Sequence, residues 1–178
     1  MISFYISSFL LGLLTICYAF IFQWAIHKNW KFCERLPRLK YIGLILGLIC
    51  LCWSAIHGCN MLEGDLAKYR VAIWILVPLG TIGGYFWLDY LFARSLGGII
   101  VLTVNYLLHA AFIQQTFFRC GYSFICLIWG VIGLYLIGAP WYWRELMEKA
   151  VKNKKLATGV VIFCVISALC FIIQPMIP

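Results

Sequence analysis

The run MISFYISSFLLGLLTICYAFIFQWAI, residues 1–26, contains no charged side chain and decides the class of fold. A helix needs about 20 apolar residues to cross a hydrocarbon core about 30 Å thick. A secretory signal would begin with a positive segment, carry a shorter apolar stretch and end at a small-residue cleavage site. We therefore predict that residues 3–26 form a retained membrane-spanning helix.

The composition extends this prediction to the whole chain. Of the 178 residues, 65% are hydrophobic and 11% are charged, whereas soluble domains are about 45–50% apolar and about 25% charged. A soluble monomer with this excess would expose far more apolar surface than is usual. We expect residues 1–178 to form a single polytopic membrane domain.

Five further apolar segments are long enough to cross a membrane, at about residues 41–59, 71–92, 97–118, 122–143 and 157–177. Backbone groups in lipid must be hydrogen-bonded within their own segment, so each segment is predicted to be a helix. The predicted fold class is an all-α integral membrane protein, a six-transmembrane-helix bundle with short loops.

The distribution of basic residues predicts the orientation of this bundle. Eleven of the 14 Lys and Arg residues fall in the first, third and fifth loops, and three fall in the second and fourth. Because cytoplasmic loops carry the excess of Lys and Arg, both termini are predicted to be extracytoplasmic. We place the protein in a plasma membrane, the inner membrane of a bacterium. The net charge of +8 comes from basic residues in the loops that flank the apolar spans. This distribution argues against a nucleic-acid partner.

The last predicted loop, Arg144–Lys155, holds five basic residues among good helix formers. It is predicted to continue the fifth span as a basic helix along the inner membrane surface. Basic clusters beside a membrane attract anionic lipid. The favoured interpretation is an orientation anchor, and specific docking of a lipid or a partner protein is the alternative.

The stretch YFWLDYLFARSLGGII, residues 85–100, is predicted to form the cytoplasmic hairpin between the third and fourth spans. Arg94 would be the inner-face anchor of this hairpin. Gly97 and Gly98 would permit the tight return of the chain, because glycine adopts turn conformations at little cost.

Asp89 is predicted to lie one helical turn inside the third span, where an ionisable group is costly and marks a candidate functional site. In the favoured interpretation Asp89 accepts hydrogen bonds from Arg94 or a neighbouring helix. In the alternative it is a proton or cation site, with Tyr85 one turn earlier on the same face.

The fourth span carries a polar stripe of Gly98, Asn105, His109 and Thr116, which fall within about 60° on one helical face. The favoured interpretation is hydrogen bonding and close packing between helices. The alternative is a polar ligand pocket lined by Asn105 and His109 against the third span, where His109 could change charge near neutral pH.

The nine cysteines form no CxxC motif. Cys59 and Cys120 are both predicted to reach the outer face, where a disulfide between them is chemically allowed and two free thiols are the favoured alternative. His57 and His109 are a conceivable haem pair, but they differ in depth and belong to no ligand pattern. No metal and no cofactor are therefore predicted.

Catalytic signatures such as HExxH, the phosphate-binding lysine loop and GxSxG are absent. The favoured function is a non-catalytic subunit or accessory factor of a membrane complex, with lipids and membrane proteins as partners. The first alternative is a small transporter or a protein that binds a small molecule or lipid at Asn105 and His109. The second is a membrane-embedded enzyme or haem protein.

Overall fold

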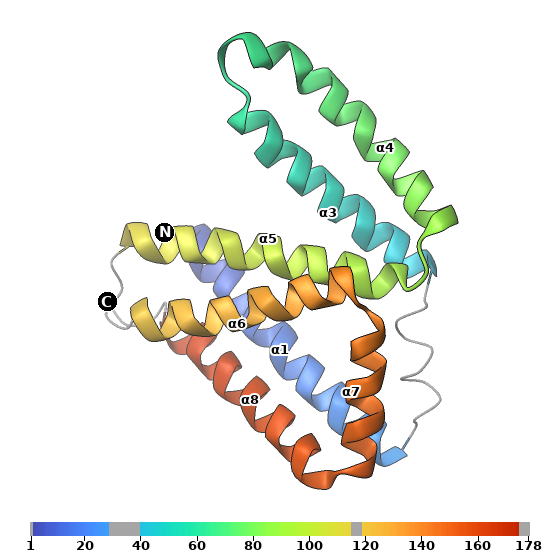
Figure 1. Cartoon of the computed structure of the whole chain (residues 1–178). Coiled ribbons are helices and arrows are strands. Elements are labelled where there is room, and N and C mark those ends of the chain that lie inside the picture. The colour runs from blue at the N-terminus through green and yellow to red at the C-terminus, as the bar shows by residue number, and fades with distance from the viewer. Residues whose placement is uncertain (1, 29–39, 115–118, 175–178) are drawn as a thin grey trace.

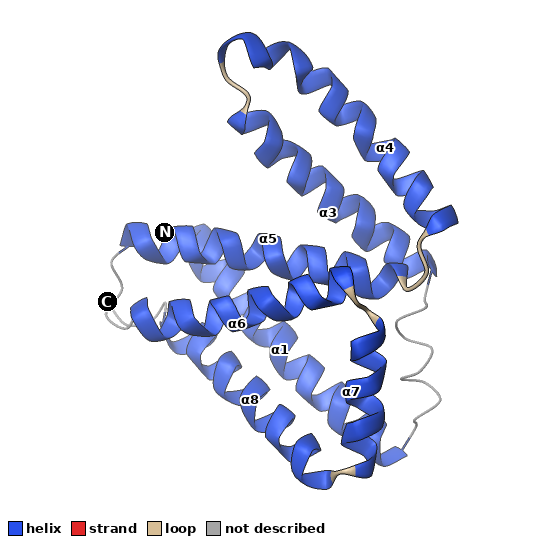
Figure 2. Cartoon of the chain, in the orientation of Figure 1, coloured by secondary structure: helices blue, strands red, loops and turns tan. Residues whose placement is uncertain are grey.

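The computed structural model describes residues 2–28, 40–114 and 119–174, which form helices joined by short turns (Figure 2). In chain order (Figure 1), the elements are α1 (Ile2–Lys28), α3 (Lys40–Met61), the 3₁₀ helix η2 (Gly64–Tyr69), α4 (Arg70–Trp87), α5 (Leu91–Gln114), α6 (Arg119–Gly138), α7 (Trp141–Lys152) and α8 (Lys154–Ile173).

Six of the described helices are long and apolar enough to cross a membrane, namely α1, α3, α4 with the preceding turn, α5, α6 and α8. The prediction of six helices long and apolar enough to span a membrane is therefore confirmed. In Figure 1 the start of α1 and the end of α8 lie at the same end of the bundle, and α7 lies at the other. The helices thus have the lengths, composition and alternating directions of a multi-pass membrane protein.

The first and last helices form an antiparallel pair that is tied to α6 by buried hydroxyl groups. The Ser8 hydroxyl of α1 donates a hydrogen bond to the Phe171 carbonyl of α8 at 2.7 Å. The Tyr122 hydroxyl of α6 hydrogen-bonds the same Ser8 oxygen at 2.9 Å. All three residues are fully buried, so these bonds hold three helices together in the interior of the bundle.

Helices α5 and α6 pack antiparallel through a glycine–glycine contact. A Cβ atom on Gly97 would lie 2.6 Å from the Gly133 carbonyl oxygen, and one on Gly133 would lie 2.9 Å from the Gly97 carbonyl oxygen. Such a separation admits no side chain at either position. Small residues permit the same close approach in many membrane helix pairs.

Helices α3 and α5 pack in parallel, again through small residues. The contacts run in the same order on both helices: Gly43 against Phe92, Gly47 against Ser95, and Cys50 against Gly98. The Ser95 hydroxyl donates to the Gly43 carbonyl at 2.9 Å. Beyond these contacts α3 leans away from α5 in Figure 1 and carries α4 with it.

The turn between α4 and α5 lies earlier than predicted. Helix α4 ends at Trp87, Leu88 is extended, and Tyr90 has a left-handed φ of 60°, after which α5 begins at Leu91. The prediction that Asp89 lies inside a helix is therefore wrong, because residues 88–90 form the connection. The prediction of a return at Gly97–Gly98 is also wrong.

The fifth span is shorter than predicted, because α6 ends at Gly138 and not at residue 143. Pro140 is the N-cap of α7, and a proline cannot continue the backbone hydrogen bonds of the preceding helix. Trp141 and Trp143 therefore belong to α7. The predicted basic helix exists, but it is a separate element.

Candidate functional site

The residues expected around the hairpin do not form one site. Asp89 is exposed in the turn and makes no ion pair with Arg94, although both residues are described. Tyr85 is half-buried near the end of α4, where the Lys40 ammonium group lies 5.8 Å from the centre of its ring. Arg94 lies in the first turn of α5 and not in the connection.

Arg94 lines a small cavity of about 260 Å³ between α3, α4 and α5. Its Nε atom is buried and has no hydrogen-bond partner in the described part of the chain. Ser95 and Gly98 line the same cavity. The arginine stem therefore runs between the helices, in contrast to the predicted anchor in an open loop.

The two glycines of the expected turn act as packing positions on two different faces of α5. Gly97 faces α6 and Gly98 faces α3, where a Cβ atom would lie 2.6 Å from the Cys50 sulfur. The sequence offers a second signal of this kind that the prediction did not use. Gly43 and Gly47 form a GxxxG motif on α3, a spacing typical of close helix pairs in membranes.

Asn105 and His109 lie on α5, and both are exposed. They share a face with Gly98, as the spacing predicts, and Thr116 of the predicted stripe lies outside the described residues. Helix α4, the expected opposite wall, packs on α3. The described helices therefore cover this face of α5 at Gly98 but leave Asn105 and His109 uncovered.

The facing side of α3 also becomes polar beyond the glycine contacts. Seven residues past the Cys50–Gly98 contact lie His57 on α3 and Asn105 on α5, in the same register. The half-buried His57 accepts a hydrogen bond at Nε2 from the Trp53 indole N–H at 2.9 Å. His109 lies one turn beyond Asn105. The diverging halves of α3 and α5 thus both present hydrogen-bonding side chains.

The described residues bring together no set of ligands for a metal. His57 and His109 are one helical turn out of register, and the described residues contain no group of three or more His, Cys, Asp or Glu side chains that could hold a metal ion. Cys59 and Cys120 are both free thiols, Cys59 half-buried and Cys120 exposed. The disulfide considered between them is not formed.

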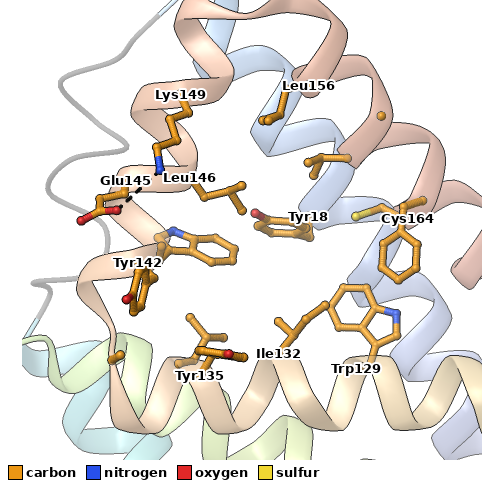
Figure 3. A pocket seen from close by; sticks show the side chains of 16 residues that line it. Tyr18, Trp129, Ile132, Tyr135, Tyr142, Glu145, Leu146, Lys149, Leu156 and Cys164 are labelled. Carbon is orange, nitrogen blue, oxygen red and sulfur yellow. Dashed lines mark ion pairs between the residues drawn. The ribbon is translucent and has the colours of Figure 1, made fainter.

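A second cavity lies elsewhere, between α1, α6, α7 and α8, with a volume of about 880 Å³ (Figure 3). The sequence did not predict this cavity, because it depends on the placement of α7 across the ends of α6 and α8. Only the aromatic residues near Pro140 and the basic helix that follows could have drawn attention to the region.

Comparison with known proteins gives no match to any family model, curated protein or solved structure. The function therefore has to be argued from the geometry of this chain.

Proposed function

We propose that this protein is a non-catalytic subunit of a membrane complex, and that the outer half of α5 packs against a transmembrane helix of a partner protein. The observation that carries the proposal is the exposed position of Asn105 and His109 on a helix apolar enough to cross a membrane. Membrane insertion, with both termini outside the cytoplasm, is part of the proposal.

The physical argument concerns the free energy of a polar side chain in lipid. An amide or imidazole group that faces hydrocarbon without a partner loses its hydrogen bonds to water and gains none. Polar side chains in membrane helices accordingly face other helices or a water-filled space. Within the described residues no helix covers Asn105 and His109, so a partner helix with a hydrogen-bonding side chain at this depth is the occupant we propose.

The arrangement of α3 and α4 supports the same proposal. Only 6% of the membrane-spanning segment of α4 and 11% of that of α3 are buried, against 28% in α5. The α3–α4 pair is held to the rest of the bundle mainly through the small residues of α3. Its divergence from α5 leaves room for a helix beside His57 and Asn105.

The small-transporter alternative uses the same residues as a ligand pocket and would need walls around them. The enzyme alternative would need Asp89, Asn105 and His109 to meet, but Asp89 lies at the turn that starts α5 and His109 lies near its other end. Neither alternative has a specific observation in its favour.

The test is to replace Asn105 and His109 by leucine in the native membrane, singly and together. Each substitution should weaken association about 3- to 30-fold, because an interhelical hydrogen bond in a membrane contributes about 0.6–2 kcal/mol. The measurement is the apparent mass and composition of the complex after mild solubilisation, with the elution of the isolated chain as a check on folding.

Thr103→Val is the matched control. It is also a polar-to-apolar change on α5, but the Thr103 hydroxyl donates to the Ile99 carbonyl of its own helix at 2.8 Å and needs no partner. Unchanged association in the double leucine variant would contradict the proposal. A complex made only of copies of this chain would also contradict the proposal, because the helix beside α5 would then belong to a second copy and not to a partner protein.

A further inference from the structure

The cavity between α1, α6, α7 and α8 has the size and lining of a binding site. Its volume of about 880 Å³ falls within the range of about 300–1,000 Å³ that is usual for small-molecule sites. In Figure 3 the labelled side chains surround an open centre, with Tyr18 and Cys164 on one side and Tyr135 and Ile132 on another.

The wall of this cavity is mostly apolar and aromatic. Tyr18 of α1 lies against Trp143 of α7, with ring centres 5.0 Å apart. Trp129 of α6 stacks on Phe163 of α8, with ring centres 6.1 Å apart. A wall of this kind suits a hydrocarbon chain, which needs contact area and offers no hydrogen bonds.

Charged groups of the cavity wall come from α7. Glu145 and Lys149 both line the cavity, 3.8 Å apart, with side chains 49% and 70% exposed. An exposed pair at this distance contributes little to stability, so Lys149 can turn to another anion. The segment Arg144–Lys155 contains five basic residues and two acidic ones, which leaves an excess of positive charge.

The apolar face of α7 packs against α1 and α8, and this packing fixes the position of the helix. Met147 and Ala150 are buried against Phe22 of α1, in a cluster that includes residues of α8. The apolar face of α7 therefore packs on the bundle, and its charged face lies next to the mouth of the cavity. This is the arrangement of an amphipathic helix at a membrane surface.

We propose that this cavity binds one anionic membrane lipid, with a hydrocarbon chain among the aromatic residues and the phosphate beside Lys149. The apolar wall accounts for the chain, and the excess of positive charge on α7 accounts for the anionic headgroup. A single lipid placed in this way would fill the space between α6, α7 and α8. The proposal rests on α7 and α8 and is independent of the partner helix on α5.

The test is native mass spectrometry of the full chain in detergent, with phosphatidylglycerol or phosphatidylcholine of identical chains added in separate samples. We expect one retained phosphatidylglycerol per chain. Gly159→Phe should abolish its retention, because Gly159 lines the cavity and a Cβ there meets no atom within 4 Å. Gly138→Phe is the matched control, since Gly138 has the same free space outside the cavity wall, and it should retain the lipid.

A second variant addresses the headgroup without any risk to folding, because the Lys149 side chain is largely exposed. Lys149→Gln should reduce the preference for phosphatidylglycerol about fivefold, the effect of one basic residue at an anionic surface. Excess inorganic phosphate should not displace the lipid. Equal retention of the two lipids by the wild type, unchanged retention in Gly159→Phe, or binding of free phosphate in place of lipid would each overturn the proposal.

Discussion

Gly97→Leu is expected to prevent the close packing of α5 on α6 and to destabilise the whole bundle. Its first side-chain atom would lie 2.6 Å from the Gly133 carbonyl oxygen and 2.8 Å from the Leu136 Cβ. Backbone atoms cannot move aside without separating the helices, so a loss of about 3 kcal/mol or more is expected. In a chain of this size that corresponds to a fall of about 6–12 °C in the midpoint of thermal unfolding.

The matched control is Gly138→Leu, the same substitution at the end of α6, where an added Cβ meets no atom within 4 Å. The measurement is the fraction of folded protein in detergent as the temperature rises, followed by size-exclusion chromatography. Equal midpoints for the two variants would show that the Gly97–Gly133 contact does not hold α5 and α6 together.

The proposed orientation, with both termini outside the cytoplasm, leads to a second prediction with a large expected effect. Cys120, which is exposed at the start of α6, should react with a membrane-impermeant maleimide in intact cells, because an accessible thiol can ionise and attack the reagent. In a chain that also carries Cys59→Ser and Cys120→Ser, a cysteine introduced by Lys152→Cys, in the exposed last turn of α7, should react only after the membrane is permeabilised.

Cys120→Ser is the control for the outer label, because it removes that thiol and leaves the buried thiols of α6 and α8 in place. Labelling of the Lys152→Cys protein in intact cells, together with protection of Cys120, would mean that the bundle is inserted the other way round. That result would leave the number of spans unchanged.

The six helices long and apolar enough to span a membrane were predictable, because a membrane helix needs an uninterrupted apolar run of about 20 residues. Their ends were less predictable. Leu88, Asp89 and Tyr90 sit in an aromatic stretch that resembles the interior of a helix, and the turn depends on one residue, Tyr90, with a left-handed φ of 60°.

The return of the chain was predicted at the wrong place because glycine occurs both in turns and at close contacts between helices. Gly97 and Gly98 were expected to form the return, but they lie inside α5 and face two different helices. The GxxxG motif of Gly43 and Gly47 was visible in the sequence, yet its partner helix was not. Which helix packs on such a motif depends on tertiary arrangement, and local pattern does not encode it.

For the candidate site, the sequence predicts only that Asn105 and His109 lie on one face of a helix. The spacing of Asn105 and His109 fixed their common face on α5, but exposure depends on where α3 and α4 lie. The cavity beside α7 was not predictable for a similar reason, because it depends on how the consecutive helices α6, α7 and α8 pack around Tyr18 of α1, which is distant in sequence.

The proposal of a partner helix is tested most directly by photocrosslinking from position 112, because Phe112 is 67% exposed on α5, lies seven residues past Asn105 on the same helical face, and can be replaced while Asn105 and His109 stay in place. A benzophenone amino acid is introduced there in the full chain, and the cells are irradiated before their membranes are isolated. The control places the same group at Leu134, which is 59% exposed on α6. The account predicts an adduct between this 20.5 kDa chain and another membrane protein from position 112 and none from position 134. Adducts with lipid alone from both positions would contradict it.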